Sequence, residues 1–179
     1  MEQWFIAAKR ADFNGIARRF QISPVLARLM RNRGLTTEEQ MEKYLHGGVK
    51  DLYDPWLLKD AEKGAAILKR KIEEKKKIRI ISDYDVDGVS SNYILYRGLL
   101  RCGAMVDYRI PDRIEDGYGI NEHLIGQACA EGIDTIITCD NGIAAAKQIR
   151  FGREKGMTLI VTDHHDIPFT EEKGKKQYH

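Results

Sequence analysis

The sequence predicts an α/β fold, a parallel sheet with helices on both faces, preceded by an N-terminal helical segment. Three observations predict it. After residue 77, short β-branched runs alternate with helix-length stretches, which is the pattern of βαβ units in a parallel sheet. The strand cores are nearly continuous apolar runs, as expected for a sheet that is covered on both sides. Before residue 78, the apolar residues follow helical spacing instead.

The N-terminal segment, residues 1–77, is expected to be a helical lead-in. Ser23 followed by Pro24 marks one helix start, because proline is favoured at the first position of a helix. Thr36 or Thr37 marks another start, and Gly47 marks the end of that helix. The expected helices cover residues 12–20, 23–34, 36–47 and 60–75.

The second segment, residues 78–169, is expected to be the α/β domain. Gly103, Gly132 and Gly156 each precede a strand, as glycines at helix ends do. The expected strands cover Ile78–Ser82, Ala104–Ile110, Ile133–Cys139 and Met157–Thr162, and the helices between them cover Val89–Arg101, Asn121–Glu131 and Ile143–Lys155. The polar and basic residues 170–179 are expected to be a frayed tail.

The composition is that of an ordinary globular protein. The chain has 179 residues, with 29 Lys and Arg against 27 Asp and Glu, which gives a net charge of +2. This near-neutral balance says little about partners. Two local clusters, Arg18–Arg33 and Lys69–Arg79, are either solvated helix faces or surfaces that attract phosphate. The composition excludes collagen-like, low-complexity, wholly disordered and disulfide-scaffold classes.

Nothing in the sequence points to a membrane or to export. No stretch reaches the roughly 18 consecutive apolar residues of a transmembrane helix. Residues 1–13 lack the apolar core of a signal peptide. The three cysteines are widely spaced and form no Cys-x-x-Cys pair, which is typical of reduced core thiols. We therefore expect a cytoplasmic protein with no membrane partner.

Carboxylates gather where the expected strands end. In an open parallel sheet, ligands bind outside the carboxyl ends of the strands. Asp83, Asp85 and Asp87 follow the first strand, and carboxylates this close repel one another unless a cation offsets the repulsion. A calcium loop is excluded, because Ile94 stands where that loop needs a glutamate. A dinucleotide loop fits poorly, because the G-x-G-x-x-G string is missing from the first turn between strand and helix.

Further polar groups follow the other strands. A single Asp in such a place is usually a helix cap or a turn former, but the joint pattern favours a metal site. Mixed carboxylate and imidazole ligands suit Mn²⁺ or Mg²⁺ better than zinc. The groups are Arg113 after the second strand, Asp140 and Asn141 after the third, and Asp163, His164 and His165 after the fourth.

Three of these strings resemble the motifs of the DHH phosphoesterase superfamily: Asp83–Gly88, Asp140–Gly142 and Asp163–His165. Over residues 22–168, the chain is most similar to the RecJ family of single-strand-specific 5′ exonucleases. The strings Ile110–Arg113 and Gly117–Gly119 support this resemblance.

The resemblance implies which residues bind metal. Asp85 and Asp87 resemble the carboxylates that hold two metal ions, and Asp140 resembles the carboxylate that bridges them. His164 resembles a further ligand. Asp83 resembles another ligand, or a residue that supports one.

The resemblance also implies which residues meet the substrate. His165 resembles a residue that contacts the scissile phosphate, and together with Asp163 it forms the predicted catalytic pair. Arg113 and Asn141 are assigned to a substrate phosphate. For Arg113, a structural salt bridge is the alternative.

The implied activity is metal-dependent 5′–3′ hydrolysis of single-stranded DNA. Two metal ions would activate a water molecule and stabilise the attacking and leaving oxygens. Two alternatives stay open: a phosphodiesterase for short oligonucleotides or cyclic dinucleotides, and a non-catalytic nucleic-acid-binding module. Tyr84 and Tyr118 are candidates for base stacking, although core packing is favoured for Tyr84.

Other parts of the RecJ family have no counterpart in this sequence. The fourteen residues after His165 hold neither the superfamily's fourth motif, with its Asp, nor the DHHA1-type domain and OB-fold. We therefore expect the chain to be the N-terminal piece of a longer enzyme, and to be weak or inactive alone.

Overall fold

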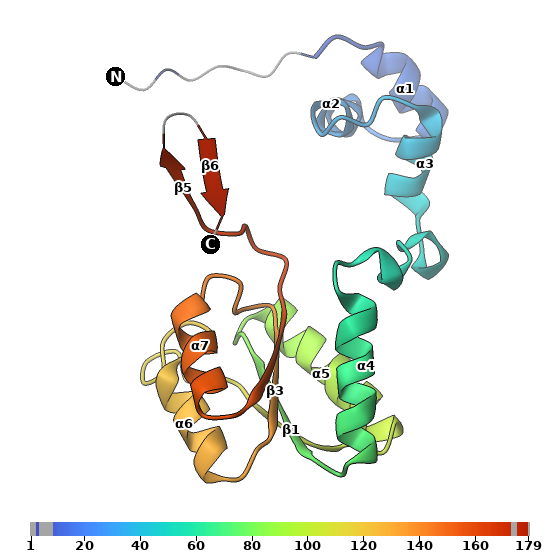
Figure 1. The fold of residues 1–179 in the computed structure, drawn as a ribbon. Helices are drawn as coiled ribbons and strands as arrows, with labels where there is room; N and C mark the ends of the chain where they lie inside the picture. Colours follow the sequence, from blue (N-terminus) through green and yellow to red (C-terminus); the bar gives the residue numbers. More distant parts are fainter. Residues whose placement is uncertain (1–2, 4–8, 173–174, 179) are drawn as a thin grey trace. The chain divides into compact units, whose positions relative to one another are not determined.

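Figure 1 shows the fold in a computed structural model, which describes residues 3, 9–172 and 175–178. The chain divides into two compact units, residues 1–58 and 59–179. The helix before the first strand belongs with the second unit. The sequence-based boundary between residues 77 and 78, which separates the helical lead-in from the α/β domain, is kept as a proposal about domain organisation.

The first unit contains three helices followed by two short 3-10 turns. Asp12 and Ser23 begin two of the helices, because their side chains accept hydrogen bonds from backbone amides three residues on. Thr37 and Gln40 form a capping box at the third. These contacts confirm the helix starts expected from the sequence. The elements are α1 (Phe13–Phe20), α2 (Pro24–Asn32), α3 (Glu38–His46), η1 (Val49–Asp51) and η2 (Pro55–Leu57).

The second unit is built on a four-stranded, fully parallel sheet with the strand order β2-β1-β3-β4. A helix follows each of the first three strands, which confirms the expected alternation. The elements are α4 (Ala61–Glu73), β1 (Lys77–Ser82), α5 (Val86–Arg101), β2 (Met105–Arg109), α6 (Glu122–Ala130), β3 (Thr135–Cys139), α7 (Ala146–Glu154) and β4 (Thr158–Thr162).

Two hydrophobic clusters cover the two faces of this sheet. Successive side chains of a strand point to opposite faces, so Ile80 joins one cluster and Ile81 the other. The cluster around Ile80 includes side chains of α4 and α5, and the cluster around Ile81 includes side chains of α6 and α7. Figure 1 shows the two pairs of helices on either side of the sheet. The prediction of helices on both faces is therefore confirmed.

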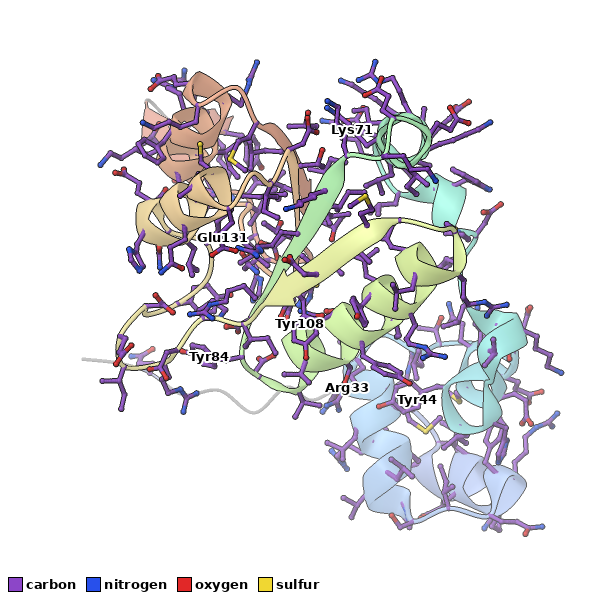
Figure 2. The ribbon with its side chains drawn as sticks, turned by 90° about the horizontal axis from the view of Figure 1, so that it is seen from below. Arg33, Tyr44, Lys71, Tyr84, Tyr108 and Glu131 are labelled. Carbon is purple, nitrogen blue, oxygen red and sulfur yellow. The ribbon has the colours of Figure 1, made fainter. Side chains whose placement is uncertain are left out.

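One charged residue interrupts the apolar run of β1. Arg79 is 8% exposed, and its guanidinium donates hydrogen bonds to Asp107 at 2.8 and 2.6 Å and to Glu131 at 2.6 Å. Glu131 is labelled in Figure 2. The bonds to Asp107, followed by the bond to Glu131, outweigh the effect of burial and raise the pKa of Arg79. Two carboxylates thus compensate a buried charge that would otherwise be costly.

The C-terminal residues form a hairpin where the sequence suggested a frayed tail. Strands β5 (Phe169–Glu172) and β6 (Lys175–Tyr178) pair antiparallel. Glu171 lies opposite Lys176, and the rings of Phe169 and Tyr178 lie 5.8 Å apart. Opposite charges and aromatic pairs across strands stabilise such hairpins.

The cysteines differ in part from the expectation of core thiols. All three are free, but only Cys139, in β3, is buried, while Cys102 and Cys129 are exposed. Cys102 is the C-cap of α5, and Cys129 lies in α6 next to the buried Ala128 but is itself exposed. Among the helices that the structure describes, none combines the length and apolar character needed to cross a membrane.

Candidate metal centre

The candidate site lies where the connections of the sheet change direction. From β1 the chain continues to β2 on one side, and from β3 it continues to β4 on the other. The carboxyl ends of β1 and β3 therefore lie at a topological switch point, where open α/β sheets bind their ligands. Asp83 directly follows β1, and Asp140 directly follows β3.

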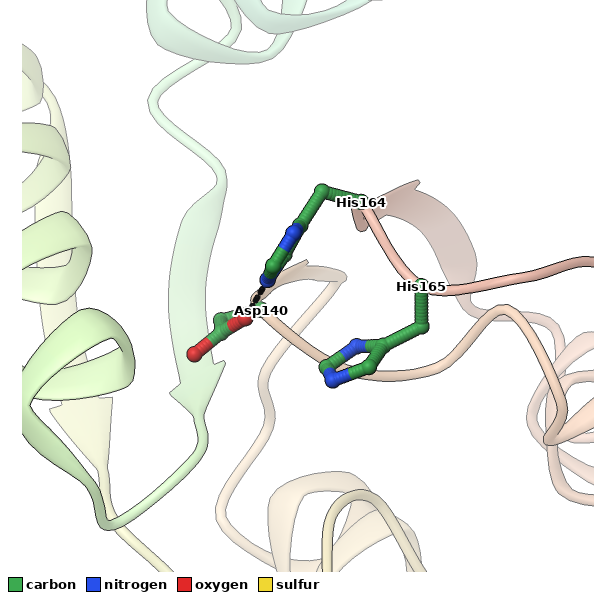
Figure 3. A group of neighbouring side chains, drawn as sticks. All are labelled: Asp140, His164 and His165. Carbon is green, nitrogen blue, oxygen red and sulfur yellow. Dashed lines mark ion pairs between the residues drawn. The ribbon is translucent and has the colours of Figure 1, made fainter. Parts of the chain in front are cut away.

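The structure brings five of the predicted site residues together. One group combines Asp83, Asp85 and Asp140, and a second combines Asp140, His164 and His165. Within each group, the possible ligand atoms lie within 4.8 Å of one another. Figure 3 shows the second group, with Asp140 on one side and the two imidazoles on the other. Because Asp140 belongs to both groups, it stands between two possible ion positions.

Asp140 reaches this position through an unusual backbone conformation. Its φ is 62°, in the left-handed region that asparagine and aspartate tolerate better than most other residues. Backbone conformations of this kind are concentrated at functional sites, where the surrounding structure imposes them. The conformation turns the chain sharply at the end of β3.

The carboxylates of Asp140 and Asp85 influence each other. The Asp140 side chain is 5% exposed, and burial, followed by the nearby Asp85, raises its pKa although the His164 imidazole at 2.8 Å opposes this. The pKa of Asp85 is lowered, first by the hydrogen bond from the Gly88 amide at 3.0 Å. Opposite pKa shifts in two neighbouring carboxylates are typical of a pair in which both groups cannot easily be ionised at once.

Asp83 gives direct support for a bound cation. Its side chain is buried, and its Oδ1 atom has no hydrogen-bond partner among the residues that the structure describes. A buried carboxylate oxygen without a donor is costly, and a divalent cation would compensate it. The oxygen-rich donor set with added imidazole suits Mn²⁺ or Mg²⁺. The residues present therefore fit the predicted metal.

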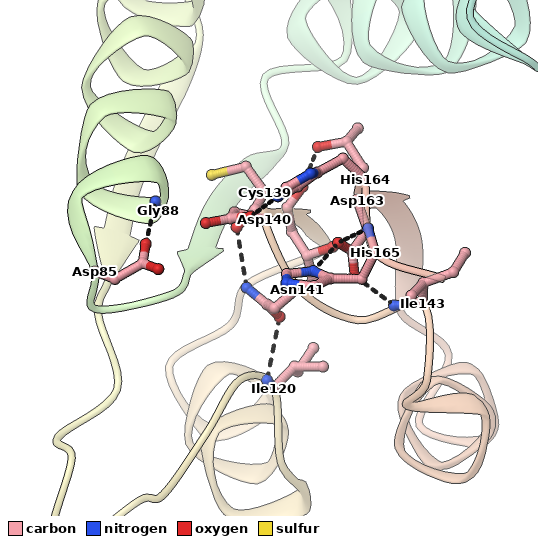
Figure 4. A network of polar contacts seen from close by, with 12 residues as sticks. Asp85, Gly88, Ile120, Cys139, Asp140, Asn141, Ile143, Asp163, His164 and His165 are labelled. Atoms are coloured by element: carbon pink, nitrogen blue, oxygen red, sulfur yellow. Dashed lines mark hydrogen bonds and ion pairs between the residues drawn. The ribbon is translucent and has the colours of Figure 1, made fainter. Parts of the chain in front are cut away.

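His165 is held by Asp163, as Figure 4 shows. The Nδ1 atom of His165 lies 2.7 Å from Asp163 Oδ1, and the Ile143 amide donates to Asp163 Oδ2 at 2.9 Å. Burial opposes ionisation of Asp163, but these hydrogen bonds outweigh it and lower the pKa of Asp163. The bond to Asp163 is also the main reason why the pKa of His165 is raised. The ring is therefore fixed in orientation and favours its protonated, cationic form.

Two of the predicted residues do not join the cluster. Asp87 lies exposed in the first turn of α5, outside both groups of possible ligands. Asn141 is 1% exposed, and its amide donates to the carbonyls of Ile81 and Cys139, both at 3.1 Å, and accepts from the Ile120 amide at 3.2 Å. With both N–H groups engaged, Asn141 has no donor left for a phosphate. It ties the ends of β1 and β3 together instead.

Arg113 and two tyrosines lie beside the cluster. The Arg113 guanidinium lies 4.5 Å from the centroid of the Tyr84 ring. The Tyr118 ring contacts Tyr84 edge-on at 6.4 Å and His165 edge-on at 6.3 Å. Tyr84 is only partly buried and belongs to neither hydrophobic cluster. The expectation of core packing for Tyr84 is therefore wrong, because its ring stacks with a cation at the surface.

Sequence reasoning missed two supports of the site. Ser82 and Asn92 are both buried, and the Asn92 amide donates to the Ser82 hydroxyl at 2.9 Å, which holds α5 against the end of β1. Gly88 lies so close to the Asp83 backbone that a Cβ atom would stand 2.4 Å from its carbonyl oxygen. The glycine after three aspartates was a visible signal, whereas nothing in the sequence marked Asn92.

Replacing Asn141 by aspartate tests its role in tying the strands. In Asn141→Asp, one carboxylate oxygen can still accept the hydrogen bond from the Ile120 amide. The other oxygen replaces the NH₂ group and stands against the carbonyl oxygens of Ile81 and Cys139, to which it cannot donate. We expect the free energy of unfolding to fall by about 3 kcal/mol or more, because a buried charge loses its donors. Urea unfolding measures this. Replacing the exposed Asn14 by aspartate is the control, and an equal loss in both variants would contradict the assignment.

The fold and the cluster define an α/β protein with a candidate metal centre at its switch point. Residues 77–178 match the DHH family, N-terminal domain. The chain therefore belongs to the DHH family. It is 38% identical over 165 residues to the single-stranded-DNA-specific exonuclease RecJ of Bacillus subtilis (strain 168), which covers 92% of this chain and 21% of that protein. It is 34% identical over 147 residues to RecJ of Escherichia coli (strain K12), which covers 81% of this chain and 25% of that protein.

Solved structures of similar proteins share the fold. An exonuclease RecJ bound to manganese is 38% identical with a TM-score of 0.59, over 65% of this chain and 30% of that one. RecJ in complex with Mn²⁺ from Thermus thermophilus is 28% identical with a TM-score of 0.61, over 90% of this chain and 22% of that one. The chain thus spans only 21–25% of the length of the two curated relatives described above.

Proposed function

We propose that this chain carries the metal-binding and phosphate-contacting groups of a metal-dependent 5′–3′ exonuclease for single-stranded DNA. The observation that carries the proposal is the buried Asp83 oxygen without a donor, beside carboxylates that converge on the same place. The proposed substrate comes from the relatives, which are single-stranded-DNA-specific exonucleases.

Side chains on both sides of the switch point would hold the metal. We assign Asp83, Asp85, Asp140 and His164 as ligands of two Mn²⁺ or Mg²⁺ ions, with Asp87 joining them from the first turn of α5. When bound, two such ions activate a water molecule and stabilise both oxygens of an in-line displacement at phosphorus. The manganese in the structures of similar proteins supports this choice of metal.

His165 would contact the scissile phosphate. Because Asp163 holds Nδ1 at 2.7 Å, Nε2 is the ring nitrogen left to donate a hydrogen bond. The hydrogen bond to Asp163 raises the pKa of His165 and so favours the protonated ring. In that form the ring would be a cationic donor that stabilises the negative charge developing on the phosphoryl oxygens. Arg113, stacked on Tyr84, would hold a neighbouring phosphate through two parallel hydrogen bonds.

Two measurements on the 179-residue chain test the proposal. Calorimetric titration with Mn²⁺ is expected to show binding that EDTA reverses. Single strands labelled at the 5′ or the 3′ end are expected to be hydrolysed from the 5′ end, only with Mn²⁺ or Mg²⁺, and weakly or not at all by this chain alone. We expect weak activity because the resemblance assigns a further metal-binding Asp to a fourth motif that has no counterpart in these 179 residues.

Several outcomes would count against the proposal. An absence of Mn²⁺ binding would favour a non-catalytic binding module. Hydrolysis that persists in EDTA would exclude the metal mechanism. Faster hydrolysis of dinucleotides or cyclic dinucleotides than of long strands would favour a different phosphodiesterase. Robust, processive degradation by this chain would contradict the expectation of weak activity.

A further inference from the structure

The first unit carries a concentration of positive charge that the whole-chain balance hides. Residues 9–33 contain seven Lys or Arg and one acidic residue, a net charge of +6, whereas the entire chain has +2. The one acidic residue, Asp12, accepts a hydrogen bond from the Gly15 amide as the cap of α1. Its carboxylate is therefore engaged with the helix end, where negative charge is favoured.

Three of these cations converge on a hollow in the surface. Lys9, Arg10 and Arg28, together with Phe13, line this open hollow of about 630 Å³. The Arg28 guanidinium lies 4.4 Å from the centroid of the Phe13 ring. Lys9 donates a hydrogen bond to the Asn32 carbonyl at 3.2 Å, which ties Lys9 to the end of α2. The hollow is therefore bounded by charges from two separate segments.

The arginines of this hollow have no partner of opposite charge among the residues that the structure describes. Within the described parts of the chain, no carboxylate forms an ion pair with Arg10 or Arg28. Arg19, on the same unit, does pair with Glu38. Uncompensated guanidinium groups around an aromatic ring suit phosphates flanked by bases, since arginine binds phosphate oxygens through paired hydrogen bonds and rings stack on bases.

We propose that this hollow binds the backbone of single-stranded nucleic acid, as a contact separate from the metal centre. The inference rests on the proposed function for single-stranded DNA as the ligand, but it needs no metal. An anionic membrane is disfavoured as the partner, because α2 exposes only Val25 and Leu29 as large apolar side chains, while its Ala27 and Met30 are buried within the protein. This leaves little apolar surface to insert into lipid.

The test measures how fluorescein-labelled oligo(dT) binds to the full chain in EDTA, by fluorescence anisotropy at several salt concentrations. The oligo(dT) has about 15 nucleotides, a length within the range of single-strand binding sites. The variant Arg10→Gln with Arg28→Gln removes two charges at the hollow. The control, Arg150→Gln with Arg153→Gln, removes two exposed charges from α7. We expect the hollow variant to bind oligo(dT) at least about tenfold more weakly. We also expect its salt slope, the slope of the logarithm of affinity against the logarithm of salt concentration, to fall in magnitude by about 1.4, because each phosphate contact to a single strand contributes about 0.7. The control should bind as the wild type does.

The result that overturns the proposal is equal affinity and equal salt slope in the hollow variant and the control, or no binding by the wild type at low salt. Capture by vesicles containing phosphatidylserine, without oligo(dT) binding, would overturn it in favour of a membrane. If the double variant melts at a lower temperature, Arg10→Gln alone, with an expected slope change of about 0.7, replaces it. The Mn²⁺ titration of the hollow variant should match the wild type, so failure here is distinguishable from failure of the metal centre.

Discussion

Replacing Asp140 by asparagine is expected to lower the affinity of this chain for Mn²⁺ by about 100-fold or more. Groups that only orient a metal ligand already contribute about 10–100-fold, and Asp140 belongs to both groups of possible ligands. Asparagine is the suitable replacement because it tolerates the left-handed backbone of residue 140. Alanine there would add backbone strain to the loss of the ligand. Calorimetric titration with Mn²⁺ measures the change.

The same variant has a second signature in its stability. Without metal, Asp140→Asn removes the repulsion from Asp85, so the free energy of unfolding should stay within about 1 kcal/mol of the wild type. With Mn²⁺ at about a hundred times its dissociation constant, the wild type should gain about 2.7 kcal/mol, and the variant should not. The control is Asp166→Asn, an exposed carboxylate near His165 but outside the cluster. Wild-type Mn²⁺ affinity in Asp140→Asn would refute the assignment of the site.

Replacing Gly88 by alanine is expected to destabilise the protein by about 1–3 kcal/mol or more. A Cβ atom at residue 88 would lie 2.4 Å from the Asp83 carbonyl oxygen and 2.6 Å from its carbonyl carbon. Because these are backbone atoms, no side-chain rotation can relieve the clash, and the start of α5 must move away from β1. Thermal melting should show a loss of about 2–4 °C for each kcal/mol. Mn²⁺ affinity should fall as well, since Asp83 is part of the displaced contact and Asp85 accepts a hydrogen bond from the Gly88 amide.

Helix α5 provides its own control for this prediction. Gly98 lies in the same helix, and a Cβ atom there would meet nothing within 4 Å. Gly98→Ala should therefore stabilise the protein by about 0.5–1 kcal/mol, because alanine loses less backbone entropy than glycine in a helix. The two identical substitutions are thus expected to have opposite signs. A similar, small effect of both would show that the close approach of Gly88 to Asp83 is not required.

Much of the candidate site could be predicted from the order of residues after each strand. In a parallel sheet, all strand ends of one kind lie at one edge, so Asp83, Asp140 and His164 had to lie near one another once the strands were recognised. Asp87 shows the limit of that reasoning. The third aspartate of the motif stands in the first turn of α5 and lies outside both groups of possible ligands, while the first two take part.

The sequence alone determined the α/β class, the helix starts of the first unit and the ends of β1, β3 and β4, because these follow from local spacing and capping. Helices α5 and α7 instead begin three residues before and three residues after the expected Val89 and Ile143. Tertiary structure decided what the side chains do at those ends. Only the packed strands β1 and β3 turn the Asn141 amide inward to bond Ile81, and only the buried position of Asp83 leaves its oxygen without a donor. The physical reason is that hydrogen-bond satisfaction and charge compensation depend on burial and on partners distant in sequence, which local patterns do not contain.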